Sequence, residues 1–476
     1  MNDKGKLLKN IAFMTVSEIS SKFVVFLTTA YLARTLNPDG MGDLAFINSF
    51  YAFFLIAVTF GFSAIGIREI SKDKTKLKSY VDTYVSMRAI ISVVSFALLI
   101  GMSLLIDVSP EVQILCIIQG SALLWNAFLL DWVFQGLERM EITSLRQIIT
   151  SLATLGLSVL FVHSRDDLGY AVVINTVLVL LNTIWIFSLH TKENAKFAFR
   201  IDWDLLHETM PAVVPLGIVA FAIAIQTGVS NIFLKAFASS EDVGFFYAAY
   251  RFSTLTVVLP VAFQNSFLPS LSRENMKDGR KSVSRSYIKI NLIVSFMVVA
   301  VIFTFSDWFA LSVFGQDYAG IGNLTKFLMF TACFSLFNVI FNACLLAWGF
   351  EKQSMYALIV SSIVNLIAQY IFTPLFGAMG AAYALFASES LMMIVLAYYY
   401  LKLTGFQFYL YAIKYFVYIA IACSAGYFSG SAIGQPIAGI AIAGLVYAGI
   451  ILGAKEISPR ELLAYAKRRG PGNIEA

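Results

Sequence analysis

A single arginine interrupts the apolar stretch GFFYAAYRFSTLTVVLP, at position 251. About eight residues precede Arg251 in its predicted helix, which places it roughly 12 Å from the helix end at the rise of an α-helix. At that depth a long side chain does not reach water easily. A planar guanidinium stays charged in a poorly hydrated site and can hold two oxygens of one phosphate group. Arg251 is therefore the first candidate binding residue. The alternative is a structural salt bridge to Asp131 or Glu389.

Other ionisable side chains also lie inside apolar segments. Burying each of them in lipid costs about 2.5 to 3.5 kcal/mol, so such residues usually line a polar cleft or pair with one another. The cations Lys22 and Arg88 are the further predicted substrate-binding residues. The carboxylates Glu18, Asp131 and Glu389 are predicted to take part in cation coupling.

Each of these residues also has a structural interpretation. Glu18 and Lys22 are four residues apart, which allows a simple ion pair along one helix. Arg88 lies about 10 Å into its helix, a depth that its side chain can nearly span toward the interface. Asp131 lies near a helix end, where it can cap the helix or pair with a base. Glu389 can be protonated, hydrogen-bonded or bound to a coupling cation, Na⁺ or H⁺.

The composition identifies the setting of these charges. Of 476 residues, 59% are hydrophobic and 13% charged, and the mean hydropathy is +0.77. These values exclude a soluble globular protein. Apolar segments of about 20 residues, the length of a membrane crossing, recur about fourteen times. The sequence thus predicts an all-α integral membrane protein with spans at 8–33, 43–65, 81–105, 111–135, 141–163, 168–190, 211–237, 243–269, 286–312, 322–348, 354–374, 378–402, 408–429 and 433–454.

No motif of catalysis or metal binding accompanies these spans. The four cysteines lie inside predicted helices without CxxC spacing, and the three histidines form no HExxH group. We therefore expect no catalytic residue, no metal site and no cofactor beyond a coupling ion. The first apolar segment is charged and ends in no cleavage site, so we expect Met1 to begin the mature chain.

Lysines and arginines are distributed on one side of the predicted topology. They gather at 4–9, 68–78, 273–289 and 455–469, whereas odd-numbered connections such as DVSPE and GQDYAG are acidic or neutral. Because short cytoplasmic loops retain basic residues, both termini are predicted to face the cytoplasm. The net charge of +5 reflects this topology, and we expect no nucleic-acid partner.

The chain also matches itself at a period of about six helices. YLARTLNPDGMG and FLKAFASSEDVG join crossings one to two and seven to eight, and GLERM and GFEKQ follow crossings four and ten. Since six is even, the halves have the same orientation and are related by a pseudo-twofold axis along the membrane normal. The predicted organisation is a six-helix lobe over 1–200, a second over 201–405, and two further helices with a tail over 406–476.

Four segments together carry a family resemblance: the opening KNIAFMTVSEISSKFVVFLTTAYLARTLNPDGMG, then GFSAIGIREISKD, LLDWVFQGLERM and VGFFYAAYRF. The chain resembles Wzx-type polysaccharide flippases, of the polysaccharide-transporter branch of the multidrug/oligosaccharidyl-lipid/polysaccharide exporter superfamily. The resemblance implies a two-lobed inner-membrane protein of bacteria that moves undecaprenyl-diphosphate-linked oligosaccharide to the periplasmic leaflet, serving polymers such as O-antigen beside a polysaccharide polymerase and chain-length proteins. It also places an arginine in the central cavity at YAAYR.

Two alternative functions have different sequence requirements. A cation-coupled multidrug exporter of the same superfamily would favour an acidic cleft, whereas the charges inside these spans are mostly cationic. A membrane-embedded polysaccharide polymerase would normally have a sizeable periplasmic loop, whereas the longest predicted connection, 190–210, lies on the cytoplasmic side. The sequence therefore favours a transporter and not an enzyme.

The charge asymmetry makes a prediction about topology. In Arg280→Cys the thiol lies on the cytoplasmic side, and in Ser240→Cys it lies on the periplasmic side. A membrane-impermeant thiol reagent added to intact cells is expected to label the second variant and not the first. The opposite labelling pattern would invert the topology.

Overall fold

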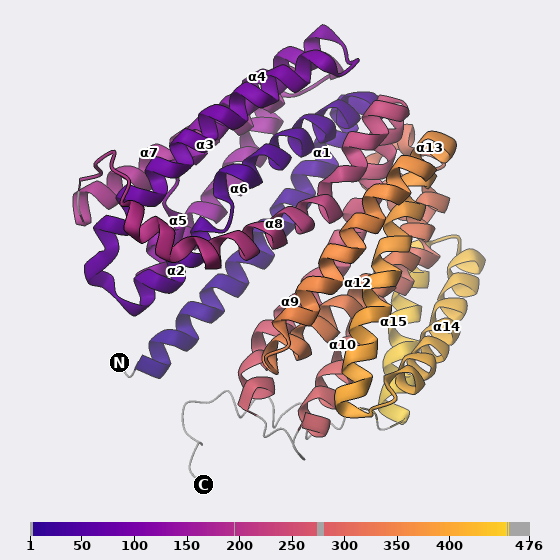
Figure 1. Cartoon of the computed structure of the whole chain (residues 1–476). Helices are drawn as coiled ribbons and strands as arrows, with labels where there is room; N and C mark the ends of the chain where they lie inside the picture. The colour runs from indigo at the N-terminus through magenta and orange to yellow at the C-terminus, as the bar shows by residue number, and fades with distance from the viewer. Residues whose placement is uncertain (1–2, 195, 274–279, 455, 457–476) are drawn as a thin grey trace.

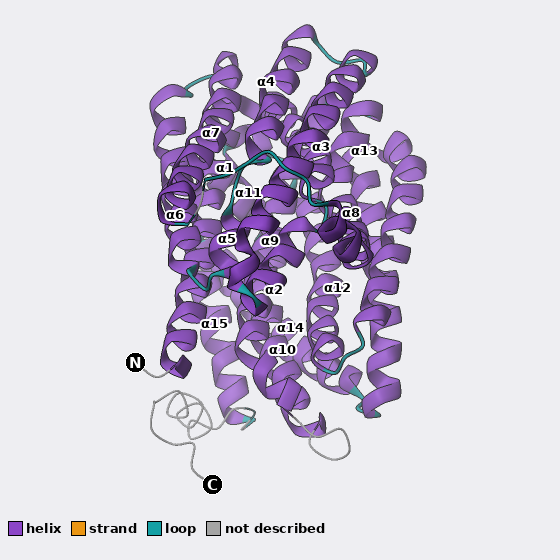
Figure 2. Cartoon of the chain, turned by 60° about the vertical axis from the view of Figure 1, so that its left-hand side comes forward, coloured by secondary structure: helices purple, strands orange, loops and turns teal. Residues whose placement is uncertain are grey.

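The computed structural model describes residues 3–194, 196–273, 280–454 and 456, and the side chains from residue 20 onward except 266, 269, 273 and 280–282. Every regular element in these ranges is a helix (Figure 2). Twelve of the helices are long and apolar enough to cross a membrane. The predicted all-α membrane fold is confirmed.

Two of these helices each contain a break and cover two predicted spans. Helix α1 (Asp3–Thr59) is broken at Asn37, whose φ of 58° is left-handed, directly before Pro38. Helix α13 (Glu351–Thr404) is broken at Gly377, with a φ of 54°. Asparagine and glycine tolerate this region of φ better than other residues. All the predicted spans thus coincide with described helices, while the exact number of crossings stays a prediction.

The two halves of the chain converge at one end of the molecule and diverge toward the end where the N-terminus lies (Figure 1). The N-terminal half continues with α2 (Phe62–Lys72), η1 (Lys74–Lys76), α3 (Leu77–Leu105), α4 (Pro110–Asn126), α5 (Asp131–Gly136), α6 (Met140–Phe161), η2 (Arg165–Asp167) and α7 (Leu168–Glu193). The C-terminal half contains α8 (Trp203–Phe237), α9 (Ser240–Arg273), α10 (Arg280–Thr304), α11 (Ser306–Phe314), η3 (Gln316–Tyr318), α12 (Gly322–Ala347), α13, α14 (Phe408–Ile433) and α15 (Pro436–Gly453). The predicted boundaries at 200 and 405 fall in connections between helices, and the division into lobes stays a prediction.

Three predicted spans are not single straight helices. The span 43–65 breaks at Phe60 and Gly61, 111–135 breaks between α4 and α5, and 286–312 breaks at Phe305. At Gly61 the cause is a close approach, since a Cβ there would lie 2.4 Å from the carbonyl oxygen of Val213 on α8. Hydropathy does not reveal such breaks because the residues around them remain apolar.

The last two helices form a closely packed pair attached to α10. A Cβ on Gly426 would lie 2.4 Å from the Gly439 carbonyl oxygen, so the α14 and α15 backbones touch. Beyond α15, the buried Glu456 carboxylate lies 3.1 Å from Lys289 Nζ on α10 and also pairs with Lys414 on α14. Burial raises the pKa of Glu456, but hydrogen bonds from Lys414, Lys289 and Tyr415 outweigh it and hold the pKa below its usual range.

The two halves interlock where they converge, at a surface that we call the closed end (residues 37–43 and 235–244). A Cβ on Gly42 would lie 1.8 Å from the Ser240 carbonyl oxygen, and a Cβ on Gly244 would lie 1.9 Å from that of Pro38. These glycines belong to the two corners that the internal repeat predicted, and each admits the backbone of the other corner. The reciprocal contact agrees with a pseudo-twofold relation between the halves.

A buried ion cluster reinforces the closed end. Asp43 Oδ1 lies 2.5 Å from Lys235 Nζ, and Asp43 Oδ2 lies 2.7 Å from Arg165 Nη2. Ser240 Oγ donates to the same carboxylate at 3.0 Å. Nearby, Arg34 Nε donates to the Val313 carbonyl oxygen at 2.9 Å. Asp43 therefore links both halves at the point where they meet.

The interlocked glycines make a prediction about conformation. Gly42→Ala and Gly244→Ala are each expected to weaken the closed end, because overpacking costs about 1 to 3 kcal/mol. In a chain without native cysteines, a thiol at Leu44→Cys, beside the cavity, should then react about fivefold faster or more with an impermeant reagent applied from the closed-end side. Gly101→Ala on α3 is the matched control, since a Cβ there meets nothing within 4 Å. Unchanged labelling in folded Gly42→Ala and Gly244→Ala would contradict the interlocking role.

Candidate functional site

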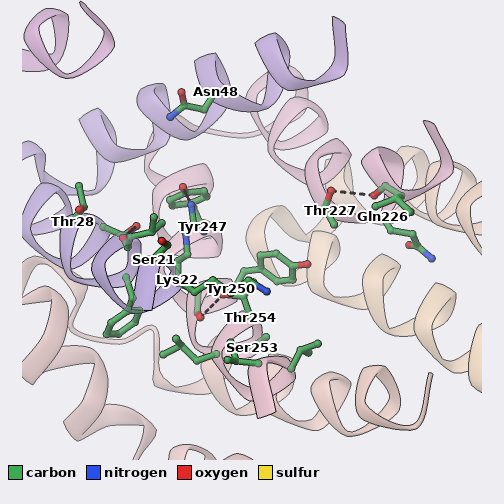
Figure 3. A pocket seen from close by; sticks show the side chains of 18 of the residues that line it. Ser21, Lys22, Thr28, Asn48, Gln226, Thr227, Tyr247, Tyr250, Ser253 and Thr254 are labelled. Atoms are coloured by element: carbon green, nitrogen blue, oxygen red, sulfur yellow. Dashed lines mark hydrogen bonds between the residues drawn. The ribbon is translucent and has the colours of Figure 1, made fainter. Parts of the chain in front are cut away.

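A cavity of about 810 Å³ lies between the two halves of the chain. Residues of α1, α6 and α7 line it from the N-terminal half, and residues of α8, α9, α12 and α13 line it from the other half. Figure 3 shows side chains of α1, α8 and α9 around it, among them Lys22, Gln226 and Tyr247. On α1 the lining runs from Ser21 to Asn48, past the kink, so the cavity extends toward the closed end.

Arg251 lies in the wall of this cavity, half-buried on α9. Its guanidinium carbon lies 4.4 Å from the ring centre of Tyr247, one turn earlier, and Nη2 donates a hydrogen bond to the Tyr247 hydroxyl. Arg251 Nε is buried and has no hydrogen-bond acceptor. Among the carboxylates whose side chains the structure describes, none forms an ion pair with Arg251. The salt bridges to Asp131 and Glu389 considered above are therefore absent from this conformation.

Lys22 lines the same cavity from α1, and its side chain is exposed. Its predicted neighbour Glu18 belongs to the part of α1 whose side chains lie outside the described residues. The proposed ion pair between them, and a coupling role for Glu18, therefore stay predictions. The structure does bring Lys22 and Arg251, which are far apart in sequence, into one cavity wall.

Glu389 also lines the cavity, from α13. Its carboxylate oxygen Oε2 accepts a hydrogen bond of 2.7 Å from Asn338 Nδ2 on α12, and the same Nδ2 lies 3.0 Å from the Glu389 carbonyl oxygen. Of the three states that the sequence allows for Glu389, this conformation shows the hydrogen-bonded one. Its predicted role in cation coupling is untested by this geometry.

Asp131 and Arg88 do not belong to the cavity wall. Asp131 forms a two-point ion pair with Arg146, from Nε to Oδ1 at 2.9 Å and from Nη2 to Oδ2 at 2.5 Å. Arg88 is only 2% exposed, and it donates to the carbonyl oxygens of Asn126 at 2.7 Å and Leu129 at 3.4 Å. Arg88 is thus buried outside the cavity lining, and its guanidinium is bonded to carbonyl groups at the break between α4 and α5.

Sequence reasoning missed Arg146 and the neutral polar residues of the wall. Arg146 was not among the predicted site residues, yet it lies in the second turn of α6 and lines the cavity. The missed amides are Asn48, Gln147, Asn175, Gln226, Asn338 and Asn342. Arg146 could have been found from its position six residues after Met140, where α6 begins, because that position lies within the helix. The amides gave only a weak signal, since isolated amides in apolar spans also occur in helix packing.

A buried network of neutral polar groups supports the wall behind Gln226. Gln226 Oε1 accepts from Asn365 Nδ2 and from Ser388 Oγ, each at 3.1 Å, and Gln226 Nε2 donates to Ser361 Oγ at 2.9 Å. One residue of α8 is thereby bonded to both parts of the kinked α13. The network fixes Ser388, the residue directly before Glu389, relative to α8.

Comparison with known proteins agrees with this architecture. A family described as polysaccharide biosynthesis protein matches residues 7–274. The chain is 24% identical over 403 residues to a candidate O-antigen transporter of Escherichia coli (strain K12), covering 82% of this chain and 95% of that protein. It is 21% identical over 418 residues to the capsular polysaccharide biosynthesis protein CapF of Staphylococcus aureus, covering 83% and 100%.

Solved structures share the fold at low sequence identity. The lipid II flippase MurJ, in an inward closed conformation, superposes with a TM-score of 0.74 at 15% identity, over 91% of this chain and 97% of that one. An inward-facing multidrug resistance transporter of the MATE family, in the MOP superfamily, gives a TM-score of 0.62 at 16% identity, over 80% and 93%. With more than half of its length matched by the family, the chain belongs to the polysaccharide biosynthesis protein family and has the fold of MOP-superfamily transporters.

Proposed function

We propose that this protein is a flippase that moves undecaprenyl-diphosphate-linked oligosaccharide from the cytoplasmic to the periplasmic leaflet of the bacterial inner membrane. The observation that carries the proposal is a guanidinium, Arg251, in the wall of a cavity between two helical halves, without a carboxylate partner among the described residues. A buried cation without a counter-ion is costly in a membrane, so an anionic ligand is the expected compensation.

The remaining lining residues suit the other parts of such a substrate. Within the described part of the wall, the acidic and basic residues are Lys22, Arg146, Arg251 and Glu389. Amides and hydroxyls surround them, and such groups can donate to and accept from sugar hydroxyls. The lipid tail would stay in the bilayer while the diphosphate and sugars occupy the cavity.

Alternating access explains how the cargo would cross. In this conformation the cavity ends at the closed end, where Asp43 and the paired glycines join the two halves. Release on that side requires these contacts to separate, which moves one half relative to the other. A polysaccharide polymerase and chain-length proteins acting on the released unit are the partners that we propose. The names of the relatives, which refer to O-antigen transport and capsular polysaccharide biosynthesis, support a role in the synthesis of a surface polysaccharide.

The multidrug exporter is the main alternative on the same fold. An exporter of organic cations needs anionic or aromatic groups in its cavity, and Glu389 is the single carboxylate in the described lining. Asp131 neutralises Arg146, but Arg251 in the wall has no carboxylate partner among the described residues, which favours an anionic cargo. The flippase is therefore the better supported function.

The first functional prediction concerns Arg251. Arg251→Ala is expected to abolish polymer export, and Arg251→Lys to lower it by about tenfold or more. The lysine keeps the charge but loses the two-point fork, and a hydrogen bond to a charged group contributes about 1.5 to 3 kcal/mol. Surface polymer in a strain lacking the native protein is the measurement. Arg285→Ala is the matched control, because its guanidinium also lies over a ring, Phe406 at 4.7 Å, outside the cavity lining.

The same experiment includes a test for a structural salt bridge. Arg251→Ala is combined with Asp131→Asn or with Glu389→Gln. If Arg251 holds the diphosphate, neither combination restores export. Recovery of export in either double variant would overturn the phosphate role, because removal of an unpaired buried carboxylate would then explain the rescue.

The second functional prediction concerns Glu389. We propose that this carboxylate takes part in coupling to Na⁺ or H⁺, so Glu389→Gln should lower transport without lowering expression. Transport is measured over a range of pH and sodium concentration. Glu351→Gln is the control, since Glu351 lies on the same helix but is exposed and outside the cavity lining. Normal transport by Glu389→Gln under all conditions would reassign the residue to helix packing.

A further inference from the structure

Three ionised side chains follow one another from α3 to the cavity wall of the N-terminal half. Arg88 on α3 contacts the break before α5, and Asp131 is the first residue of α5. Arg146 on α6 donates hydrogen bonds to the Asp131 carboxylate. Only Arg146 lines the cavity. The proposed function so far assigns no task to Arg88 or Asp131.

The break between α4 and α5 places Asp131. Residues 127–130 leave the helix, and Arg88 donates to the carbonyl oxygens of Asn126, the last residue of α4, and of Leu129, inside this turn. The chain then restarts at Asp131 and α5 packs beside α6. A buried guanidinium that satisfies exposed carbonyl groups stabilises such a turn where water is absent.

Asp131 in turn fixes the orientation of Arg146. Its two carboxylate oxygens occupy Nε and Nη2 of the guanidinium, at 2.9 and 2.5 Å. Within the described residues Nη1 makes no hydrogen bond, and the side chain keeps 18% of its surface exposed. The two N–H groups of Nη1 are therefore available to a ligand in the cavity.

Stability alone does not account for this arrangement. Well-packed apolar side chains of similar volume are often at least as stabilising as a buried ion pair, and each charge costs free energy to insert into the membrane. A carboxylate paired with a guanidinium does hold that guanidinium in one orientation before the ligand binds. The arginine side chain then loses less conformational entropy on binding. The pair is formally neutral, so Arg146 contributes oriented hydrogen bonds, whereas Arg251 contributes uncompensated charge from the other half.

We infer that Arg146 is a second binding residue of the cavity for a phosphate oxyanion, and that Asp131 and Arg88 are positioning residues that orient it. This inference rests on the proposed function and deepens it. The diphosphate is held from both halves of the chain, by Arg251 on α9 and by Arg146 on α6. Asp131, which the sequence assigned to cation coupling, acts through Arg146.

Exchange of the two charges separates this role from a purely structural ion pair. The double variant Asp131→Arg with Arg146→Asp rebuilds the pair but moves the guanidinium to position 131, which does not line the cavity. We expect the exchange to restore the thermal stability that Asp131→Asn loses. Affinity for farnesyl diphosphate, measured on purified protein, and polymer export should both stay about tenfold or more below wild type, which corresponds to about 1.4 kcal/mol.

The matched control is the exchange of Arg139 and Glu193, an ion pair between the residue before α6 and the last residue of α7, outside the cavity lining. It should leave affinity and export unchanged. Recovery of both readouts in the Asp131/Arg146 exchange would overturn the inference. Should that exchange fail to fold, Arg146→Lys decides the question. Lysine can still pair with Asp131, but it has one nitrogen where arginine has three, so no second nitrogen is left for the ligand. Wild-type affinity for farnesyl diphosphate in Arg146→Lys would likewise overturn it.

The two proposals fail differently. If the wild-type protein binds no isoprenyl diphosphate and Arg251→Ala exports polymer normally, the proposed function fails. If Arg251→Ala loses binding and export while the Arg146 variants match wild type, only the role of Arg146 fails.

Discussion

The cost of placing a charged or hydrogen-bonding group in hydrocarbon constrains the whole molecule. This cost explains why most buried charged side chains of the protein have partners. Asp43 lies between Lys235 and Arg165 at the closed end, and Asp131 is held by Arg146 beside the cavity. Neither Arg88 nor Arg251 has an ion pair among the described residues. The Arg88 guanidinium donates to carbonyl oxygens of the chain, whereas the described contacts of Arg251, in the cavity wall, are an aromatic ring and a hydroxyl. Arg251 thus has neither a carboxylate nor a carbonyl partner at a place where a ligand can enter.

The same constraint makes the two halves of the cavity chemically different. On the C-terminal side, neutral amides and hydroxyls bind one another around Gln226, and Glu389 is held by Asn338. On the N-terminal side, an ion pair orients Arg146 against the wall. A pseudo-twofold fold can therefore present unlike groups to the unlike parts of one amphipathic molecule, although the two halves have similar helices.

Conformational change is expected to concentrate where the two halves are in direct backbone contact, without side chains between them. Gly42 and Gly244 bring two backbones into direct contact, so the closed end has no flexible side chains there to absorb a shift. The Asp43 cluster adds a charged contact between the same two corners. Such a joint favours two discrete arrangements, closed or separated, which is what alternating access requires.

The sequence by itself determined the class of protein, the helical spans, the corners of the internal repeat and the position of Arg251 inside an apolar helix, because hydropathy, charge and glycine pattern are local along the chain. The tertiary structure decided the partners. Asp43 and Lys235 are 192 residues apart, and Asp131 meets Arg146 only because the chain breaks between α4 and α5. Neither the breaks nor the amide-lined wall could be predicted, since a side chain's surroundings in a membrane depend on which helices pack together, and helical periodicity does not encode that choice.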